Sequence, residues 1–253
     1  MPLPTTGELL GIWDAGSDHD HTGRALLLLE RLAGAVSAGT ASGPPAGDDL
    51  ADLPVGARDH LLLDLRERLF GPRLEAVAPC PACGAQLEIA FTVADIRADP
   101  SPVARQLTID IDGYHVTVRL PTSRDLAAVA GSRDLAEARA GLLARCLVEV
   151  RQPEVTAANG LLPGEVGAVV ARALSEADPQ AEVRLALDCA LCGHRWETFF
   201  DIVAYLWAEI EQVAVRALRE VHTLARAYGW SEPAILALSP RRRRHYLELV
   251  ADG

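Results

Sequence analysis

Two cysteine pairs have a spacing that points to a particular chemistry, metal binding. Cys80 and Cys83 form the first pair, Cys189 and Cys192 form the second, and two residues separate the members of each pair. This spacing lets both thiolates of a pair reach one ion about 2.3 Å away, while backbone amides of the turn point at the sulfurs. Glycine follows the second cysteine of each pair and suits the left-handed backbone of such a turn. Because four thiolates fill a tetrahedral shell, we predict one structural Zn²⁺ with no open position for catalysis.

Other uses of these cysteines fit the sequence less well. A redox pair requires a thioredoxin-like βαβ context, which the neighbouring sequence does not predict. Disulfides require an oxidising compartment, and the start of the chain, Met1–Pro4, lacks the basic flank and apolar stretch of a secretory signal. A site that has lost its metal is the third alternative. We expect His194 to be a bystander beside four thiolates, and Cys146 to be a small buried residue of an apolar helix.

The rest of the sequence predicts no catalytic centre. The run Asp18–His21 contains metal-binding residue types, but it lies between two predicted helices and is typical of a solvated acidic connector. Glycine-rich phosphate-binding patterns are absent from the sequence, and no nucleophile, base and acid can be assigned. We therefore expect a protein that is not an enzyme and has no small-molecule substrate.

The composition restricts the partners and the compartment. The chain has 253 residues and a formal net charge of −11, and all 24 of its basic residues are arginine. An acidic chain repels phosphate backbones, which argues against general nucleic-acid binding. Its apolar runs are far shorter than the ~18 residues that a membrane-spanning helix requires. We expect a cytoplasmic protein with reduced cysteines and no membrane partner.

The elements that must position the cysteines can be read from the periodicity of apolar residues. Helical spacing is found before Gly71 and again after Asp201, and alternation typical of strands is found between them. The helices are expected at residues 9–13, 24–32, 55–70, 135–148, 163–174 and 201–228, with two short helices after Ser231 and Ser239. The strands are expected at 87–93, 107–110, 115–120 and 182–187. Thr122 or Ser123 should cap a further helix, and a Gly/Ser/Ala/Pro connector is expected at 33–47.

The two cysteine segments also resemble each other. When Cys80 is aligned with Cys189, Leu87 aligns with Trp196 and Phe91 with Phe200, so each knuckle leads into an apolar strand. This is the construction of a zinc ribbon. We predict an α+β fold in which the ribbon carries an inserted β-hairpin and helices between flanking helical segments. The expected regions are helical 1–75, ribbon 76–200 with a hairpin at 105–121 and helices at 122–177, and helical 201–253.

The end of the chain contains the strongest charge run, Arg241, Arg242, Arg243 and Arg244. On the predicted helix these arginines surround most of the circumference, and Tyr246 belongs to its apolar side. Three interpretations are open: the helix docks a partner, with Trp230 nearby, it packs on the protein's own core, or its arginines form a solvated face.

Read in order, these segments resemble a known family. The segments that carry the resemblance are Arg24–Leu26, Leu53–Asp59, Phe70–Leu74, the first knuckle, Leu120–Leu126, Asp178–Glu182, the second knuckle with Trp196, Tyr205–Trp207, Glu220–Ala225, Tyr228–Glu232, and Leu238–Arg243 with Tyr246–Leu247. They are similar to the T-even-type baseplate hub assembly chaperones found in gene clusters for contractile phage-tail-like injection systems. The resemblance spans nearly the whole chain and implies binding to baseplate hub or wedge proteins without catalysis. A zinc-ribbon module that binds nucleic acid or regulates is the alternative.

Overall fold

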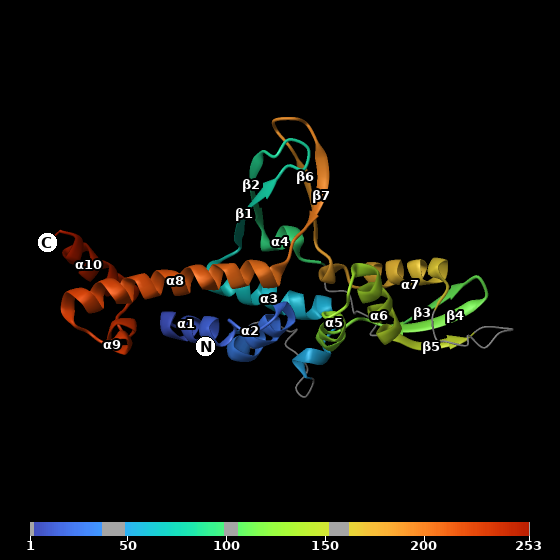
Figure 1. The fold of residues 1–253 in the computed structure, drawn as a ribbon, viewed down its shortest axis with the longest axis horizontal. Helices are drawn as coiled ribbons and strands as arrows, with labels where there is room; N and C mark the ends of the chain where they lie inside the picture. Colours follow the sequence, from blue (N-terminus) through green and yellow to red (C-terminus); the bar gives the residue numbers. More distant parts are fainter. Residues whose placement is uncertain (1–2, 37–48, 99–105, 152–161, 253) are drawn as a thin grey trace. The chain divides into compact units, whose positions relative to one another are not determined.

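The computed structural model describes residues 3–36, 49–98, 106–151 and 162–252. The chain divides into two compact units. Unit 1 combines residues 1–39 with residues 202–253, so it is built from both ends of the chain, and unit 2 comprises residues 40–201. Figure 1 shows the elements of each unit along the chain.

Unit 1 is entirely helical in its described residues. Its helices are α1 (Thr6–Ala15), α2 (His21–Val36), α8 (Ile202–Tyr228), α9 (Glu232–Leu236) and α10 (Pro240–Ala251). The long helix α8 buries one apolar stripe, including Leu206, Ile210 and Leu224, and α1, α2, α9 and α10 all pack against it. Gly229 ends α8 with a φ of 69°, as expected for a residue at this C-cap. The amphipathic pattern of α8 therefore organises the whole unit.

Unit 2 mixes short sheets with helices. Its helical elements are η1 (Leu50–Asp52), α3 (Val55–Phe70), α4 (Val93–Ile96), α5 (Ser123–Val129), α6 (Leu135–Cys146), α7 (Gly164–Ala177) and η2 (Pro179–Ala181). Its strands are β1 (Arg73–Pro79), β2 (Gln86–Thr92), β3 (Gln106–Ile111), β4 (Tyr114–Arg119), β5 (Leu147–Arg151), β6 (Arg184–Asp188) and β7 (Arg195–Phe199). The strands form three antiparallel sheets, β1–β2, β3–β4–β5 and β6–β7. Mixed helices and antiparallel sheets confirm the predicted α+β class.

The three-stranded sheet has a small core of its own. Val116 and Val118 of β4 are fully buried and pack with Val166 and Val170 of α7. The turn between β3 and β4 places Asp112 at φ 48° and Gly113 at φ 78°, the left-handed pair that a two-residue hairpin needs. The predicted hairpin is thus present from Gln106 to Arg119, while residue 105 lies outside the described residues.

Helix α3 is fixed to the segment that precedes the second cysteine pair. The buried Asp178 carboxylate accepts a 2.9 Å hydrogen bond from the Gly56 N–H in the first turn of α3. A Cβ on Gly56 would lie 1.8 Å from Asp178 Oδ1, so only glycine leaves room for this contact. Burial raises the pKa of Asp178, although the Gly56 hydrogen bond and the Arg58 charge oppose that effect. The contact holds η2, the short segment between α7 and β6 in the chain, against α3.

Two elements differ from the sequence predictions. The helix expected at 135–148 ends at Cys146, and Leu147–Arg151 pairs with β4 as β5, so the predicted helical block 122–177 contains a strand. Periodicity could not separate these states, because Leu147 and Val150, which pack in the core of the three-stranded sheet, are three residues apart, a spacing that a helix also uses. The strand β1 was not predicted, because two of its three inward-facing positions, Ala76 and Ala78, hold small residues that give a weak alternating pattern.

The segment boundaries also differ from the predicted regions. Helix α3 was grouped with the N-terminal helices, whereas it belongs to unit 2 through its contact with η2. The terminal helical segments were treated separately, whereas they form one unit around α8. The expected connector at 33–47 lies mostly outside the described residues, and α2 continues through Val36.

Candidate metal centre

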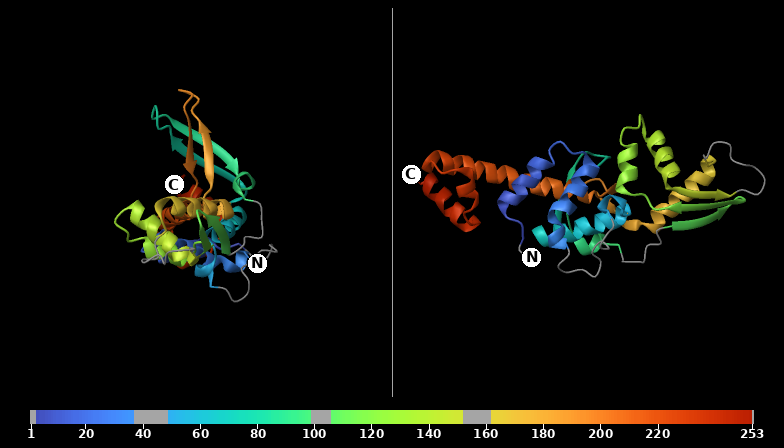
Figure 2. Two further views of the ribbon diagram at one scale, coloured as in Figure 1. Left: turned by 90° about the vertical axis from the view of Figure 1, so that its right-hand side faces the viewer. Right: turned by 90° about the horizontal axis from the view of Figure 1, so that it is seen from below.

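The two cysteine pairs lie at the tips of two β-hairpins. The hairpin β1–β2 turns between Pro79 and Gln86, and the hairpin β6–β7 turns between Asp188 and Arg195. Figure 2 shows the two hairpins side by side. The four Sγ atoms of Cys80, Cys83, Cys189 and Cys192 all lie within 4.8 Å of one another. The structure therefore brings together all four predicted ligands, which come from segments more than 100 residues apart.

Both tips have the same backbone turn. The N–H of Cys80 donates to the Ala85 carbonyl at 2.8 Å, and the N–H of Cys189 donates to the His194 carbonyl at 2.9 Å. Gly84 and Gly193 adopt φ values of 73° and 70°, which any residue with a Cβ would disfavour. This equivalence confirms the internal similarity of the two knuckles.

Backbone amides also point at the sulfurs. The Ala85 N–H reaches the thiol of Cys83, the His194 N–H reaches that of Cys192, and the N–H groups of Leu191 and Cys192 reach that of Cys189. Such donors stabilise thiolates, because charged acceptors form the stronger hydrogen bonds. Each turn is therefore built to hold ionised sulfur.

Equivalent residues of the two hairpins contact each other reciprocally. Cys80 Sγ lies 3.7 Å from Cys192 Sγ, and its counterpart Cys189 Sγ lies 3.7 Å from Cys83 Sγ. Phe91 at the end of β2 meets its counterpart Phe200, with ring centroids 5.4 Å apart and the planes at 89°. Reciprocal contacts of this kind are typical of a local two-fold arrangement. The hairpins are thus joined at their tips by sulfur and near their bases by aromatic rings.

Two of the six sulfur–sulfur separations match those of a tetrahedral metal shell. Ligands about 2.3 Å from a central zinc ion are separated from one another by about 3.8 Å in a regular tetrahedron. The two measured separations of 3.7 Å agree with this value. All five cysteines of the chain are free thiols, so neither pair forms a disulfide. Cys80 and Cys189 are buried, while Cys83 and Cys192 are exposed.

The crowded thiols also favour a cation. The pKa of Cys189 is lowered to about 7, chiefly by the backbone N–H of Cys192. The pKa of Cys192 is raised to about 12, because desolvation and the neighbouring thiols together outweigh the lowering by the His194 N–H. Four thiolates this close repel one another unless a positive ion lies between them. A divalent ion would let all four ionise together.

The other residues considered from the sequence have local roles. The ring of His194 stacks on Trp196, with centroids 5.9 Å apart. Cys146 is buried, and burial together with the Asp125 charge raises the pKa of its thiol to about 11, so it is protonated at neutral pH. Asp20 of the exposed run Asp18–His21 accepts a 2.7 Å hydrogen bond from the Gly23 N–H and caps α2.

The structure separates the members of the arginine run. Arg243 is buried and its Nε donates to Glu220 at 2.9 Å, whereas Arg241, Arg242 and Arg244 are exposed. Trp230 and Tyr246 form an edge-to-face pair with ring centroids 4.9 Å apart, inside a cluster around Leu224 and Ile235. These two aromatic residues thus pack within unit 1.

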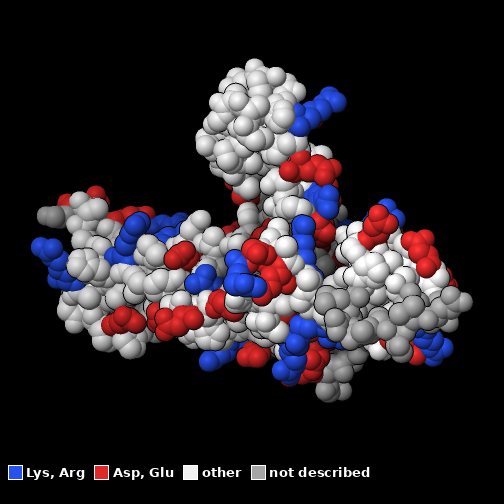
Figure 3. Space-filling model, turned by 45° about the vertical axis from the view of Figure 1, so that its right-hand side comes forward, with Lys and Arg blue, Asp and Glu red and all other residues white. Residues whose placement is uncertain are grey.

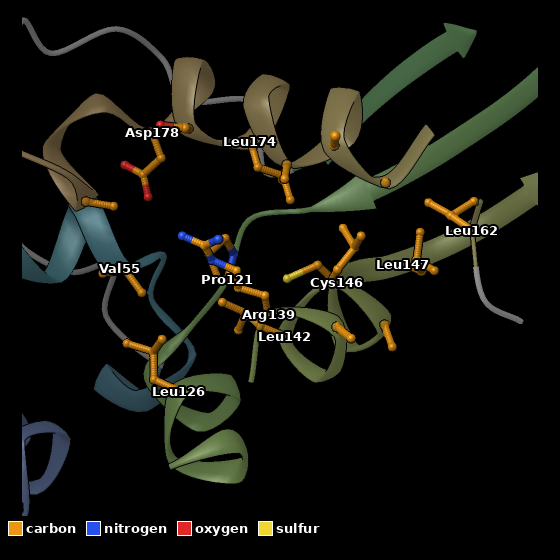
Figure 4. A pocket seen from close by; sticks show the side chains of 18 of the residues that line it. Val55, Pro121, Leu126, Arg139, Leu142, Cys146, Leu147, Leu162, Leu174 and Asp178 are labelled. Carbon is orange, nitrogen blue, oxygen red and sulfur yellow. The ribbon is translucent and has the colours of Figure 1, made fainter. Parts of the chain in front are cut away.

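A groove of unit 2 was not predicted from the sequence. It has a volume of about 860 Å³ and lies between α6 and α7, with Leu143, Leu147 and Leu174 on its walls and Asp178 at one end (Figure 4). Its lining comes from α3, α5, α6, α7 and η2, so no local sequence pattern reveals it. The Cys146 thiol points into this groove (Figure 4).

Comparisons with known proteins identify the family to which the chain belongs. Within the described residues, no helix is both long enough and apolar enough to span a membrane. No curated protein and no solved structure matches the chain. The family model described as "T4 bacteriophage base plate protein" matches residues 44–207, a stretch that contains all four clustered cysteines. Because this match covers more than half of the sequence, the chain belongs to the T4 bacteriophage base plate protein family.

Proposed function

We propose that the chain is a non-catalytic component or assembly chaperone of the baseplate of a contractile phage-tail-like injection system. The observation that carries this proposal is the family match over residues 44–207, which covers almost all of unit 2. In this proposal the protein acts in the cytoplasm by binding hub or wedge proteins. The ordered resemblance of the segments flanking the knuckles to hub assembly chaperones supports that finer assignment.

The four cysteines serve this role as a structural Zn²⁺ site. Tetrahedral all-thiolate shells suit zinc or iron, and zinc contributes no redox chemistry. When bound, the ion would supply charge neutralisation and a rigid link between the two hairpins. Cys80, Cys83, Cys189 and Cys192 would hold it, and their closed shell would leave no position for a reacting water. Such a site supports a structural role for the metal within a protein that acts by binding.

The joined tip of the hairpins supports a protein-binding role. The exposed residues of its two turns are uncharged: Pro81, Ala82, Cys83, Gly84, Ala190, Leu191, Cys192, Gly193 and His194. The exposed ion pair of Arg195 and Asp188 flanks the second turn. Leu191 at the second knuckle is 81% exposed. Figure 3 shows the tip as a rounded surface almost without acidic or basic side chains, although the chain has a net charge of −11. Exposed apolar groups on a fixed support are typical of protein contacts.

The test is mass spectrometry of finished particles and of cytoplasmic subassemblies from the native cell, with metal analysis of the purified chain. A chain found only in subassemblies acts as a chaperone, and one found in particles at fixed stoichiometry is a baseplate component. The same preparations from cells carrying Leu191→Asp should contain less of the chain. Leu135→Asp is the matched control, because Leu135 is 65% exposed and lies on α6, away from the tip.

The proposal is abandoned if the chain occurs in neither fraction. Association with nucleic acid in the same cells would then favour the alternative of a zinc-ribbon nucleic-acid-binding or regulatory module. One equivalent of zinc per chain is expected, and iron or no metal would remove the zinc assignment without touching the baseplate role.

A further inference from the structure

The first turn of α10 carries three arginines that no described residue pairs with. Arg241, Arg242 and Arg244 are exposed, and no ion pair to them occurs among the residues that the structure describes. Elsewhere, many exposed arginines do have such partners, as Arg133 has Glu137 and Arg151 has Glu149. Three exposed positive charges therefore lie close together at this turn, on a chain with a net charge of −11.

This position is unfavourable for positive charge within the protein itself. Ser239 caps α10 by accepting from the Arg242 N–H, so the arginines follow the helix N-terminus directly. The helix dipole places partial positive charge at that end, where acidic residues stabilise and basic residues destabilise. The first turn contains no acidic residue, and neighbouring arginines repel one another. Folding of α10 does not benefit from these three charges.

The same turn is held rigidly. Arg243 donates to the Glu220 carboxylate, to the Leu236 and Leu238 carbonyls and, at 3.0 Å, to the Thr6 hydroxyl. The packing of Tyr246 against Trp230 fixes the next turn of the helix. Only the buried member of the run is thus engaged within the protein, and it fixes the backbone that carries the other three, so that a partner has to order only their side chains.

A groove ends at Pro240, the residue that precedes Arg241, and its lining includes one acidic residue, Glu8. It has a volume of about 660 Å³ and is lined by Pro4–Glu8 and by Leu236–Pro240, with Arg243 in its wall. An extended segment can lie in such a groove and place its side chains beside the first turn of α10. A groove next to unpaired arginines fits a flexible segment better than a flat surface.

We propose that Arg241, Arg242 and Arg244 bind an acidic segment of a partner protein. Charge complementarity selects acidic side chains, which would meet both the guanidinium groups and the positive end of the helix. Nucleic acid is disfavoured because the net charge of −11 repels a phosphate backbone. Identifying the partner as a baseplate protein rests on the proposed function, whereas the acidic chemistry of the segment does not.

The test uses the full chain in its native cell with Arg241→Gln, Arg242→Gln and Arg244→Gln combined. The tagged chain is isolated with its bound proteins at about 0.1 M salt, where exposed charges still interact over roughly 10 Å, and again at about 0.5 M. The matched control combines Arg133→Gln, Arg151→Gln and Arg172→Gln, which removes the same charge from exposed sites on other elements. A photo-crosslinking residue replacing Arg241 then identifies the bound segment by mass spectrometry.

We expect the α10 variant to retain at least tenfold less partner at low salt, the control to retain it fully, and Arg→Lys at the same three positions to retain most of it. The unfolding temperature of the α10 variant should equal or exceed that of the wild type. The crosslinked peptide should be rich in Asp and Glu. Three results would overturn the inference. The two Gln variants could retain equal amounts of partner, or the crosslink could map to an apolar or basic segment. Nuclease treatment could also release the chain from its bound material. If the chain assembles normally while the α10 variant behaves as wild type, the inference fails and the proposed function stands.

Discussion

At the scale of single residues, the four clustered thiols matter most, because together they form the ligand cluster found among the described residues. Removing one sulfur leaves three ligands, and His194 is already stacked on Trp196. The remaining thiols would then bind a metal weakly, and the two hairpin tips would lose their link. Metal binding and folding are thermodynamically coupled in such sites.

Cys80→Ser should therefore abolish stoichiometric metal binding. It should also lower the free energy of unfolding by several kcal/mol, which is a fraction of the ~10–16 kcal/mol of apparent binding free energy at structural zinc sites. Metal analysis and thermal unfolding measure both effects. Cys146→Ser is the control, since Cys146 is buried on α6 outside the cluster and should keep the metal content unchanged. Equal metal content in Cys80→Ser and wild type would contradict the ligand assignment.

A second prediction at this scale concerns Gly56. A Cβ at this position would lie 1.8 Å from Asp178 Oδ1, so Gly56→Ala should separate α3 from η2 and destabilise unit 2 by about 1–3 kcal/mol. Gly11→Ala is the matched control, because Gly11 also lies in a helix and a Cβ there would meet no described residue outside that helix within 4 Å. That control should stabilise by up to about 1 kcal/mol through helix propensity. Chemical denaturation of the two variants distinguishes these opposite signs.

At the scale of elements, buried polar contacts decide where helices dock. In the run at the start of α10, Arg243→Ala leaves Glu220 without its partner and frees the Thr6, Leu236 and Leu238 oxygens. We expect a loss of about 2–4 kcal/mol, somewhat below a fully buried pair because Glu220 is partly exposed. Arg244→Ala, on the exposed side, should change stability by less than about 0.5 kcal/mol. Similar losses from both substitutions would show that Arg243 does not anchor the helix.

Asp125 plays the corresponding role between α5, α6 and β4. Its buried carboxylate accepts from Arg119, from Arg145 at 2.9 Å, and from the Thr122 N–H and hydroxyl. Burial alone would raise the pKa of Asp125, but these hydrogen bonds hold it well below its ordinary value.

Because the pKa of Asp125 is lower in the folded state than in the unfolded state, its ionised carboxylate stabilises the fold. This contribution is present above the ordinary Asp pKa of 3.8 and is lost as the pH falls below it. Asp125→Asn should therefore be destabilised at neutral pH, and its difference from wild type should shrink as the pH falls below about 4. Chemical denaturation of both proteins across this pH range measures the difference in stability. Loss of metal in acid affects both proteins equally and therefore cancels in the difference. A difference independent of pH would contradict this account of Asp125.

The sequence predicts long, strongly periodic elements and the ligand set well. Helices α3 and α8, the hairpin β3–β4 and the cysteine quartet all follow from local patterns that their tertiary contacts reinforce. The strands β1 and β5 were missed, because pairing with distant residues decides their conformation and propensity does not. The groove, the buried position of Arg243 and the contact of Gly56 with Asp178 were also missed, since each joins elements far apart in sequence.

At the scale of the whole molecule, the metal should act on one unit only. All five cysteines lie in unit 2, and the Cys83–Cys189 contact closes a loop of 106 residues. A crosslink over a loop of this length restricts the unfolded chain by an amount worth on the order of 4–5 kcal/mol.

Removing the metal with a chelator should therefore increase hydrogen exchange in β1, β2, β6 and β7 and lower the thermal transition of unit 2. The exchange of α8, α9 and α10 should change little, because unit 1 contains no cysteine. Hydrogen exchange followed by mass spectrometry resolves these segments. A chelator effect that is equally large in α8 would show that the units unfold together.

The composition of unit 1 from both ends of the chain has a consequence for biosynthesis. Helices α1 and α2 leave the ribosome early, but the helix that covers their apolar residues, α8, begins at Ile202. At about 5–20 residues per second, the nascent chain waits on the order of ten seconds or longer before Leu9, Leu10 and Leu28 can be buried against α8. Unit 2 has left the ribosome by that time, so α1 and α2 are translated before unit 2 but belong to a unit that can be completed only after it. During this interval the apolar residues of α1 and α2 remain exposed. We expect ribosome-associated folding factors to bind them before the protein can take part in any assembly.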